Sequence, residues 1–139
     1  MTERGRVMAI DYGDKRIGLA LSDPTRTIAS PLGHIVRRAG KRPPLAEIMR
    51  RAAEHEVTAL VIGLPLDQEG DDTARAAEVR AIAVELEKRT AMPVTLVDER
   101  YSSVEAAARL RVDPGAGPHG LDCAAAQLIL QQHFDDRGR

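Results

Sequence analysis

The stretch from Val7 to Asp23 limits the fold most, because it consists of two short apolar runs joined by a tight polar turn. Apolar residues occupy positions 7 to 10 and positions 17, 19 and 21, which is typical of a strand and its hairpin partner. Gly13 and Gly18 supply permissive backbone where the chain bends. Asp11 closes the first run, where an acid would face out of the end of the sheet. We therefore expect Asp11 to be the first ligand of a divalent-metal site that two later acidic residues complete.

The rest of the chain alternates between predicted helices and strands, which is the pattern of an α/β protein. A third strand is expected over residues 27–36, where Pro31 lacks an N–H and restricts pairing to a sheet edge or a bulge. The continuous apolar run at 58–63 is typical of a strand that is buried on both faces. The other expected elements are a helix from Leu45, a helix over 73–89, a strand over 93–97, a helix over 102–111, and a last helix with Leu121, Ala125, Leu128 and Ile129 on one face. Residues 135–139 are expected to form a frayed tail.

Length and composition exclude several classes of protein. A chain of 139 residues predicts a single domain over residues 1–139, because domains usually contain roughly 100–200 residues. Aromatic residues make up only 2%, so platforms that stack single-stranded bases are nearly absent. The single cysteine, Cys123, is interpreted as a small buried apolar residue in a reducing compartment. Without a signal segment or a run of ~18 apolar residues, we expect a cytoplasmic protein with no membrane partner.

Acidic residues recur at comparable places in the predicted elements. Asp11 ends the first strand, Glu99 follows the end of a later strand, and Asp122 lies early on the last helix. Ligands of parallel α/β sheets bind at the carboxyl ends of strands, so the first two acids can share a rim. Carboxylates are hard oxygen ligands that suit Mg²⁺ or Mn²⁺. Two such ions about 3.5–4 Å apart would activate a water and stabilise the leaving oxygen in phosphodiester hydrolysis.

Each acid also has a simpler explanation. Asp11 can start a turn, since aspartate is common in turns. Asp122 in the first turn of a helix is favourable to the helix dipole without any ligand. Asp98 and Glu99 can form a surface ion pair with Arg100, worth ~0–1 kcal/mol.

Five segments together resemble the YqgF/RuvX family. They are Ala9–Gly13 with Arg16–Gly18, Val61–Pro65, Asp98–Ser102 and Leu121–Ala125, and they occur in the family's order over nearly the whole chain. The resemblance implies an RNase H-like fold, a mixed five-stranded sheet flanked by helices. It also implies a nuclease, a hydrolase acting on ester bonds, that depends on Mg²⁺ or Mn²⁺. Members are described as nucleases for the 5′ end of pre-16S rRNA and as Holliday junction resolvases.

Carried over residue by residue, the resemblance makes Asp11, Glu99 and Asp122 the catalytic, metal-binding acids. Asp98 is the alternative to Glu99, because neighbouring side chains of an extended segment point to opposite sides and only one of the two faces the metal. We favour Glu99. His119 stands where other members of the superfamily often carry a further acid. This difference either weakens the second metal or provides a proton-transfer group.

Basic residues near these acids are candidates for binding nucleic acid. Lys15 and Arg16 lie in the predicted hairpin turn and Arg100 adjoins the predicted ligands, so these three are best placed to hold phosphates. Arg37 and Arg38 belong to a basic linker that can grip phosphates or remain a solvated loop. The net charge of −1 argues against binding by bulk attraction but leaves a locally basic face open.

Alternative functions stay open from the sequence. Asp11-Tyr12-Gly13 also resembles the phosphate loop of actin-type and sugar-kinase enzymes, but those proteins duplicate the domain and no second copy of the motif occurs here. A non-catalytic RNA-binding module for ribosome assembly would use the same surface. Within the nuclease interpretation we place processing of pre-16S rRNA before resolution of branched DNA. Resolving a four-way junction needs two paired cuts and hence a homodimer, whereas a monomer can trim an RNA end.

Overall fold

The computed structural model describes residues 5–13, 15–26, 28–37, 42–67, 69–98 and 120–137, with side chains in the last segment described at 126–134 only. The elements in chain order are β1 (Arg6–Tyr12), β2 (Arg16–Ser22), β3 (Ala29–Val36), α1 (Leu45–Glu54), β4 (Val57–Leu64), α2 (Ala74–Thr90), β5 (Val94–Asp98) and α4 (Gly120–Arg137). These bounds confirm the predicted hairpin, third strand, buried strand and flanking helices. The helix expected over 102–111 lies outside the described residues.

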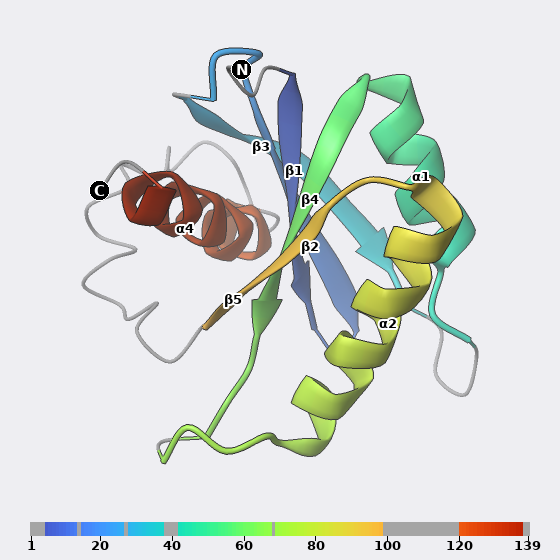
Figure 1. Cartoon of the computed structure of the whole chain (residues 1–139), viewed down its shortest axis with the longest axis vertical. Coiled ribbons are helices and arrows are strands. Elements are labelled where there is room, and N and C mark those ends of the chain that lie inside the picture. Colours follow the sequence, from blue (N-terminus) through green and yellow to red (C-terminus); the bar gives the residue numbers. More distant parts are fainter. Residues whose placement is uncertain are drawn as a thin grey trace.

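The strands form one five-stranded sheet in the order β3-β2-β1-β4-β5. β2 is antiparallel to β1 and to β3, whereas β4 runs parallel to both β1 and β5. Helices α1 and α2 cover one face of this sheet and α4 covers the other (Figure 1). The predicted mixed sheet flanked by helices is therefore confirmed.

Strand alternation divides the core into two layers. Met8 and Ile10 of β1 pack toward α1 and α2, in a cluster that includes Ile48 and Leu86. Val7 and Ala9 of the same strand point the other way, into a cluster with Ala126, Ile129 and Leu130 of α4. β4 contributes Leu60 and Ile62 to the first cluster and Val61 to the second, which confirms that this strand is buried on both faces.

β3 forms an edge of the sheet, as Pro31 predicts. The register between β2 and β3 shifts between Leu19 and Ala20, whose partners are Gly33 and Pro31. Gly33 adopts a φ of +113°, which glycine tolerates better than other residues. The proline is thus accommodated by both an edge position and a bulge.

Helix α2 begins where a capping side chain is available. The hydroxyl of Thr73 accepts a hydrogen bond from the backbone N–H of Ala76 at 3.0 Å. Such a cap satisfies one of the orphan donors at a helix start and contributes about 1 kcal/mol. The helix ends at Thr90, and the C-cap residue Ala91 has a left-handed φ of 59°.

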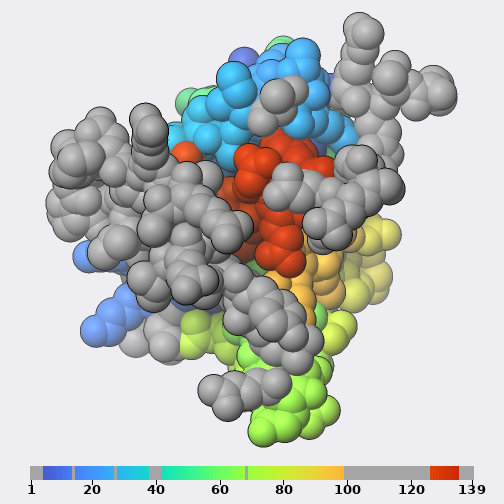
Figure 2. Space-filling model, turned by 90° about the vertical axis from the view of Figure 1, so that its left-hand side faces the viewer, coloured from blue at the N-terminus to red at the C-terminus, as the bar shows by residue number. Residues whose placement is uncertain are grey.

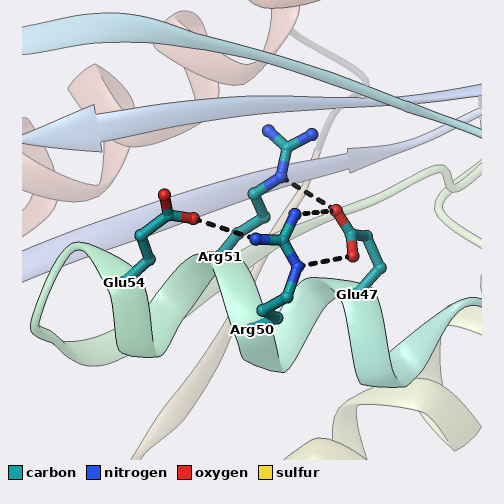
Figure 3. A network of polar contacts seen from close by, with 4 residues as sticks. All are labelled: Glu47, Arg50, Arg51 and Glu54. Carbon is teal, nitrogen blue, oxygen red and sulfur yellow. Dashed lines mark hydrogen bonds and ion pairs between the residues drawn. The ribbon is translucent and has the colours of Figure 1, made fainter.

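Helix α1 carries a network of ion pairs on its exposed side (Figure 3). Glu47 accepts from Arg50 at 2.5 Å and from Arg51 at 3.1 Å, and Arg50 also reaches Glu54 at 3.2 Å. The hydrogen bonds from Arg50 and then Arg51 lower the pKa of Glu47 from 4.5 to about 2. Two arginines near the basic linker are thus paired with carboxylates of their own helix.

Helix α4 corrects two expectations. Among its described side chains, Ala126, Ile129, Leu130 and His133 are buried, whereas Leu128, expected on one face with Ile129, is only half-buried. Small and apolar residues occupy several sides of this helix, so periodicity alone does not identify the side that meets the sheet. The helix also continues to Arg137, so residues 135–137 are helical rather than frayed. None of the described helices is long and apolar enough to span a membrane.

Candidate functional site

Asp11 lies inside the paired part of β1, in register with Gly18 of β2. It therefore does not start a turn, and that simpler explanation is wrong. Because Val7 and Ala9 face α4, alternation places the Asp11 side chain on the same face of the sheet. Asp11 is half-buried and lies on that face rather than pointing off the end of the strand.

Glycines flank Asp11 on both neighbouring strands. Gly18 is its partner on β2, and Gly63 follows Ile62, the partner of Ile10 on β4. Neither glycine carries a side chain that could fill the sheet surface beside the carboxylate. Among the described residues, no group donates a hydrogen bond to the carboxylate of Asp11. Carboxylate oxygens that accept no hydrogen bond from the described residues are hard ligands suited to a divalent cation.

Asp98 is the last residue of β5 and pairs with Leu64. Val94 and Leu96 pack toward α1 and α2, and Val97 packs toward α4. Alternation therefore places the Asp98 side chain on the face opposite to Asp11. Its backbone carbonyl accepts a 3.4 Å hydrogen bond from Nε2 of Gln132 on α4. The structure brings the Asp98 backbone near α4 but does not bring the two carboxylates together.

Asp122 is in the first turn of α4, with only its backbone described. That helix packs over β2, β3 and β1, so it covers the face to which Asp11 points. Figure 2 shows the described side chains of α4, in red, beside the light-blue surface of β3. Glu99, Arg100, Arg38 and His119 lie outside the described residues. Within the described ranges no group of three His, Cys, Asp or Glu side chains could hold a metal ion.

Lys15 and Arg16 are both exposed where β1 turns into β2. The Lys15 side chain has no partner among the described residues, so it is available to a ligand at this edge of the sheet. This edge also holds the carboxyl ends of β1 and β4, which run parallel.

Arg37 has internal partners instead. Its guanidinium pairs with Glu78 of α2 at 2.9 Å, donates to the backbone oxygen of Gly13 at 2.9 Å, and stacks 4.2 Å from the centre of the Tyr12 ring. Its side chain is only 16% exposed. Arg37 is therefore less available to a phosphate than Lys15.

Glu78 and Tyr12 are partners that sequence reasoning missed. The Tyr12 hydroxyl donates to Oε1 of Glu78 at 2.9 Å across 66 residues of sequence. Burial first, and then this hydrogen bond, raise the pKa of Tyr12 to about 12. One signal was available in the sequence. The chain is poor in aromatic residues and has only two tyrosines, and the hydroxyl of a buried tyrosine needs a hydrogen-bond partner.

Comparison with known proteins gives consistent matches. Residues 5–136 match the family model RuvX, described as Holliday junction resolvase. A protein of Roseiflexus sp. (strain RS-1), named "Putative pre-16S rRNA nuclease", is 42% identical over 140 residues, covering 98% of this chain and 98% of the relative. An Anaeromyxobacter sp. (strain Fw109-5) protein of the same name is 42% identical over 136 residues, covering 95% of this chain and 98% of the relative.

Among solved structures, T. thermophilus RuvC in complex with Holliday junction substrate matches with a TM-score of 0.62 and 14% identity, covering 96% of each chain. At so low an identity the likeness concerns the fold alone. It confirms the RNase H-like fold expected from the sequence.

Proposed function

Because this chain belongs to the RuvX family, we propose that it is a divalent-metal-dependent nuclease that hydrolyses phosphodiester bonds at the 5′ end of pre-16S rRNA. The whole chain, residues 1–139, acts as one catalytic domain in the cytoplasm. The observation that carries the proposal is Asp11, a half-buried carboxylate between two glycines on the face that α4 covers.

The metal ligands in this proposal are Asp11, Glu99 and Asp122. Carboxylate oxygens are the ligands that Mg²⁺ and Mn²⁺ prefer, and the described part of the site fits them, since the Asp11 carboxylate accepts no hydrogen bond from the described residues. A pair of such ions would supply the positive charge that activates a water and stabilises the leaving oxygen.

Glu99 is preferred over Asp98 as the second acid. The support is strand alternation, in which residues two apart share a face. Val97 faces α4, as Asp11 does, and Glu99 is two residues after Val97, whereas Asp98 lies on the opposite face. Lys15 and Arg16 hold the phosphate backbone beside the metal ligands, with Arg100 and Arg38 as further contacts.

RNA is preferred over branched DNA as the substrate. The relatives near 40% identity carry the pre-16S rRNA nuclease name, whereas the RuvC structure shares the fold at 14% identity. Resolution of Holliday junctions is the second candidate, favoured by the family description and requiring a homodimer for paired cuts.

The test is cleavage of two labelled substrates, an RNA carrying the 16S 5′ extension and a four-way DNA junction. Each is incubated with Mn²⁺, Mg²⁺ or EDTA and with wild type, Asp11→Asn or the control Asp71→Asn, which alters an exposed carboxylate on the loop after β4. We expect metal-dependent cutting of the RNA that is lost only in Asp11→Asn.

Other outcomes would redirect the proposal. Cutting of the junction alone would establish the second candidate. Metal-independent RNA binding without cleavage, unchanged by Asp11→Asn, would indicate a non-catalytic assembly module.

A further inference from the structure

Arg37, from the end of another strand, binds the described backbone of the β1–β2 turn at Gly13 and Lys15. The backbone N–H of Gly13 donates to the carbonyl of Arg16 at 3.0 Å and closes the turn. Arg37, which directly follows β3, donates its backbone N–H to the carbonyl of Lys15 at 2.8 Å. The Arg37 guanidinium donates to the carbonyl of Gly13 at 2.9 Å. Arg37 therefore binds the backbone on both sides of the turn.

Glu78 orients that guanidinium from helix α2. A single oxygen, Oε1, accepts hydrogen bonds from Arg37 and from the Tyr12 hydroxyl, each at 2.9 Å. The guanidinium also lies over the Tyr12 ring, an arrangement that favours a cation. Because Arg37, Tyr12 and Glu78 constrain one another, the guanidinium has little freedom to leave the turn.

These contacts also bear on Asp11. Tyr12 is the next residue of the same strand, on the opposite face of the sheet. Arg75 of α2 donates to the backbone carbonyl of Tyr12 at 3.3 Å. Helix α2 therefore holds the strand end through both the side chain and the backbone of Tyr12.

Arg37 and Lys15, two of the cations at this end of the sheet, differ in whether a carboxylate neutralises them. Glu78 neutralises Arg37, whose side chain is mostly buried, whereas Lys15 is exposed and has no partner among the described residues. We propose that Glu78 and Arg37 are positioning residues, which hold the turn so that Lys15 meets a phosphate of the RNA strand cleaved beside Asp11. This inference rests on the proposed function.

The test is a double-mutant cycle on RNA binding. Affinity for the labelled 16S 5′-extension RNA is measured over a series of salt concentrations for Lys15→Ala, Glu78→Gln and the double variant. All three are made in the Asp11→Asn protein, where binding is read without cleavage. The matched control is Glu85→Gln, which removes another α2 carboxylate, whose ion pair among the described residues is with Arg89 at 2.8 Å on the same helix.

We expect Lys15→Ala to reduce the slope of log affinity against log salt by about 0.7, the contribution of one phosphate contact on a single strand. Glu78→Gln should weaken binding by about threefold, within the range of a partly exposed ion pair. It should have no further effect in the Lys15→Ala protein, because both changes remove the same contact. Arg37→Lys keeps the charge but loses the planar fork, so it should match Glu78→Gln. Glu85→Gln should bind like the parent.

Several results would overturn the inference. One is a Glu78→Gln protein that melts at a lower temperature but binds RNA normally, which would make the cluster purely structural. Another is a loss of RNA affinity in Glu78→Gln that adds fully to the loss in Lys15→Ala. If cleavage requires Asp11 but the effects of Lys15→Ala and Glu78→Gln on RNA affinity are independent, only the inference fails. If the parent protein binds no RNA, the proposed function fails with it.

Discussion

Replacing Gly13 with alanine should open the β1–β2 turn. A Cβ at this position would lie 2.6 Å from the backbone oxygen of Arg16. That oxygen belongs to the backbone and already accepts the hydrogen bond from the Gly13 N–H at 3.0 Å. It cannot rotate away as a flexible side chain would, so the turn itself must move.

The cost can be estimated from these two contacts. Overpacking of a tight site costs about 1–3 kcal/mol, and a lost backbone hydrogen bond about 1 kcal/mol. Because the turn can partly relax, we expect a loss of about 2 kcal/mol in the free energy of unfolding. For a chain of this size that corresponds to a Tm lower by about 6 °C. Cleavage should fall as well, since the displaced turn carries Lys15.

Gly5→Ala is the matched control at the other end of the sheet. Gly5 has a φ of +109°, and an added Cβ would lie 2.5 Å from Oγ1 of Thr58. This variant should lose stability to a similar degree, yet keep wild-type cleavage below its melting temperature. Thermal unfolding and RNA cleavage are measured on both variants. A Gly13→Ala protein with unchanged Tm would refute the steric argument, and equal loss of cleavage in Gly5→Ala would refute the link to function.

Glu99→Gln should abolish metal-dependent RNA cleavage while Asp98→Asn keeps it, and the reverse result would make Asp98 the ligand. Because the pKa of Glu47 is lowered to about 2, its contribution to stability is complete above pH 4.5 and is lost as the pH falls toward 2. Melting curves of Glu47→Gln should lose that part of the acid limb, and an unchanged limb would contradict the ion-pair network. Leu130→Ala removes a fully buried side chain between α4 and the sheet and should cost about 2–5 kcal/mol in denaturant unfolding. A cost below 1 kcal/mol would mean that α4 does not pack there.

The local features of this fold could be predicted from the sequence. Apolar alternation predicted the β1–β2 hairpin, the apolar run predicted the buried strand β4, and Pro31 predicted a sheet edge or a bulge. Each of these signals acts through a residue's own backbone or its immediate neighbours, so no tertiary information was needed. The motifs around Asp11 likewise pointed to the family that the comparisons then matched.

Only the tertiary structure decided which residues meet across the sheet. The side of α4 that carries Ile129 and Leu130 became identifiable once the helix was seen against the strands. From the sequence, Arg37 is one more cation of a basic linker. The structure shows that it pairs with Glu78, which is far away in sequence. The strand register places glycines beside Asp11 on both neighbouring strands. This register is set by the packing of whole strands rather than by any local pattern.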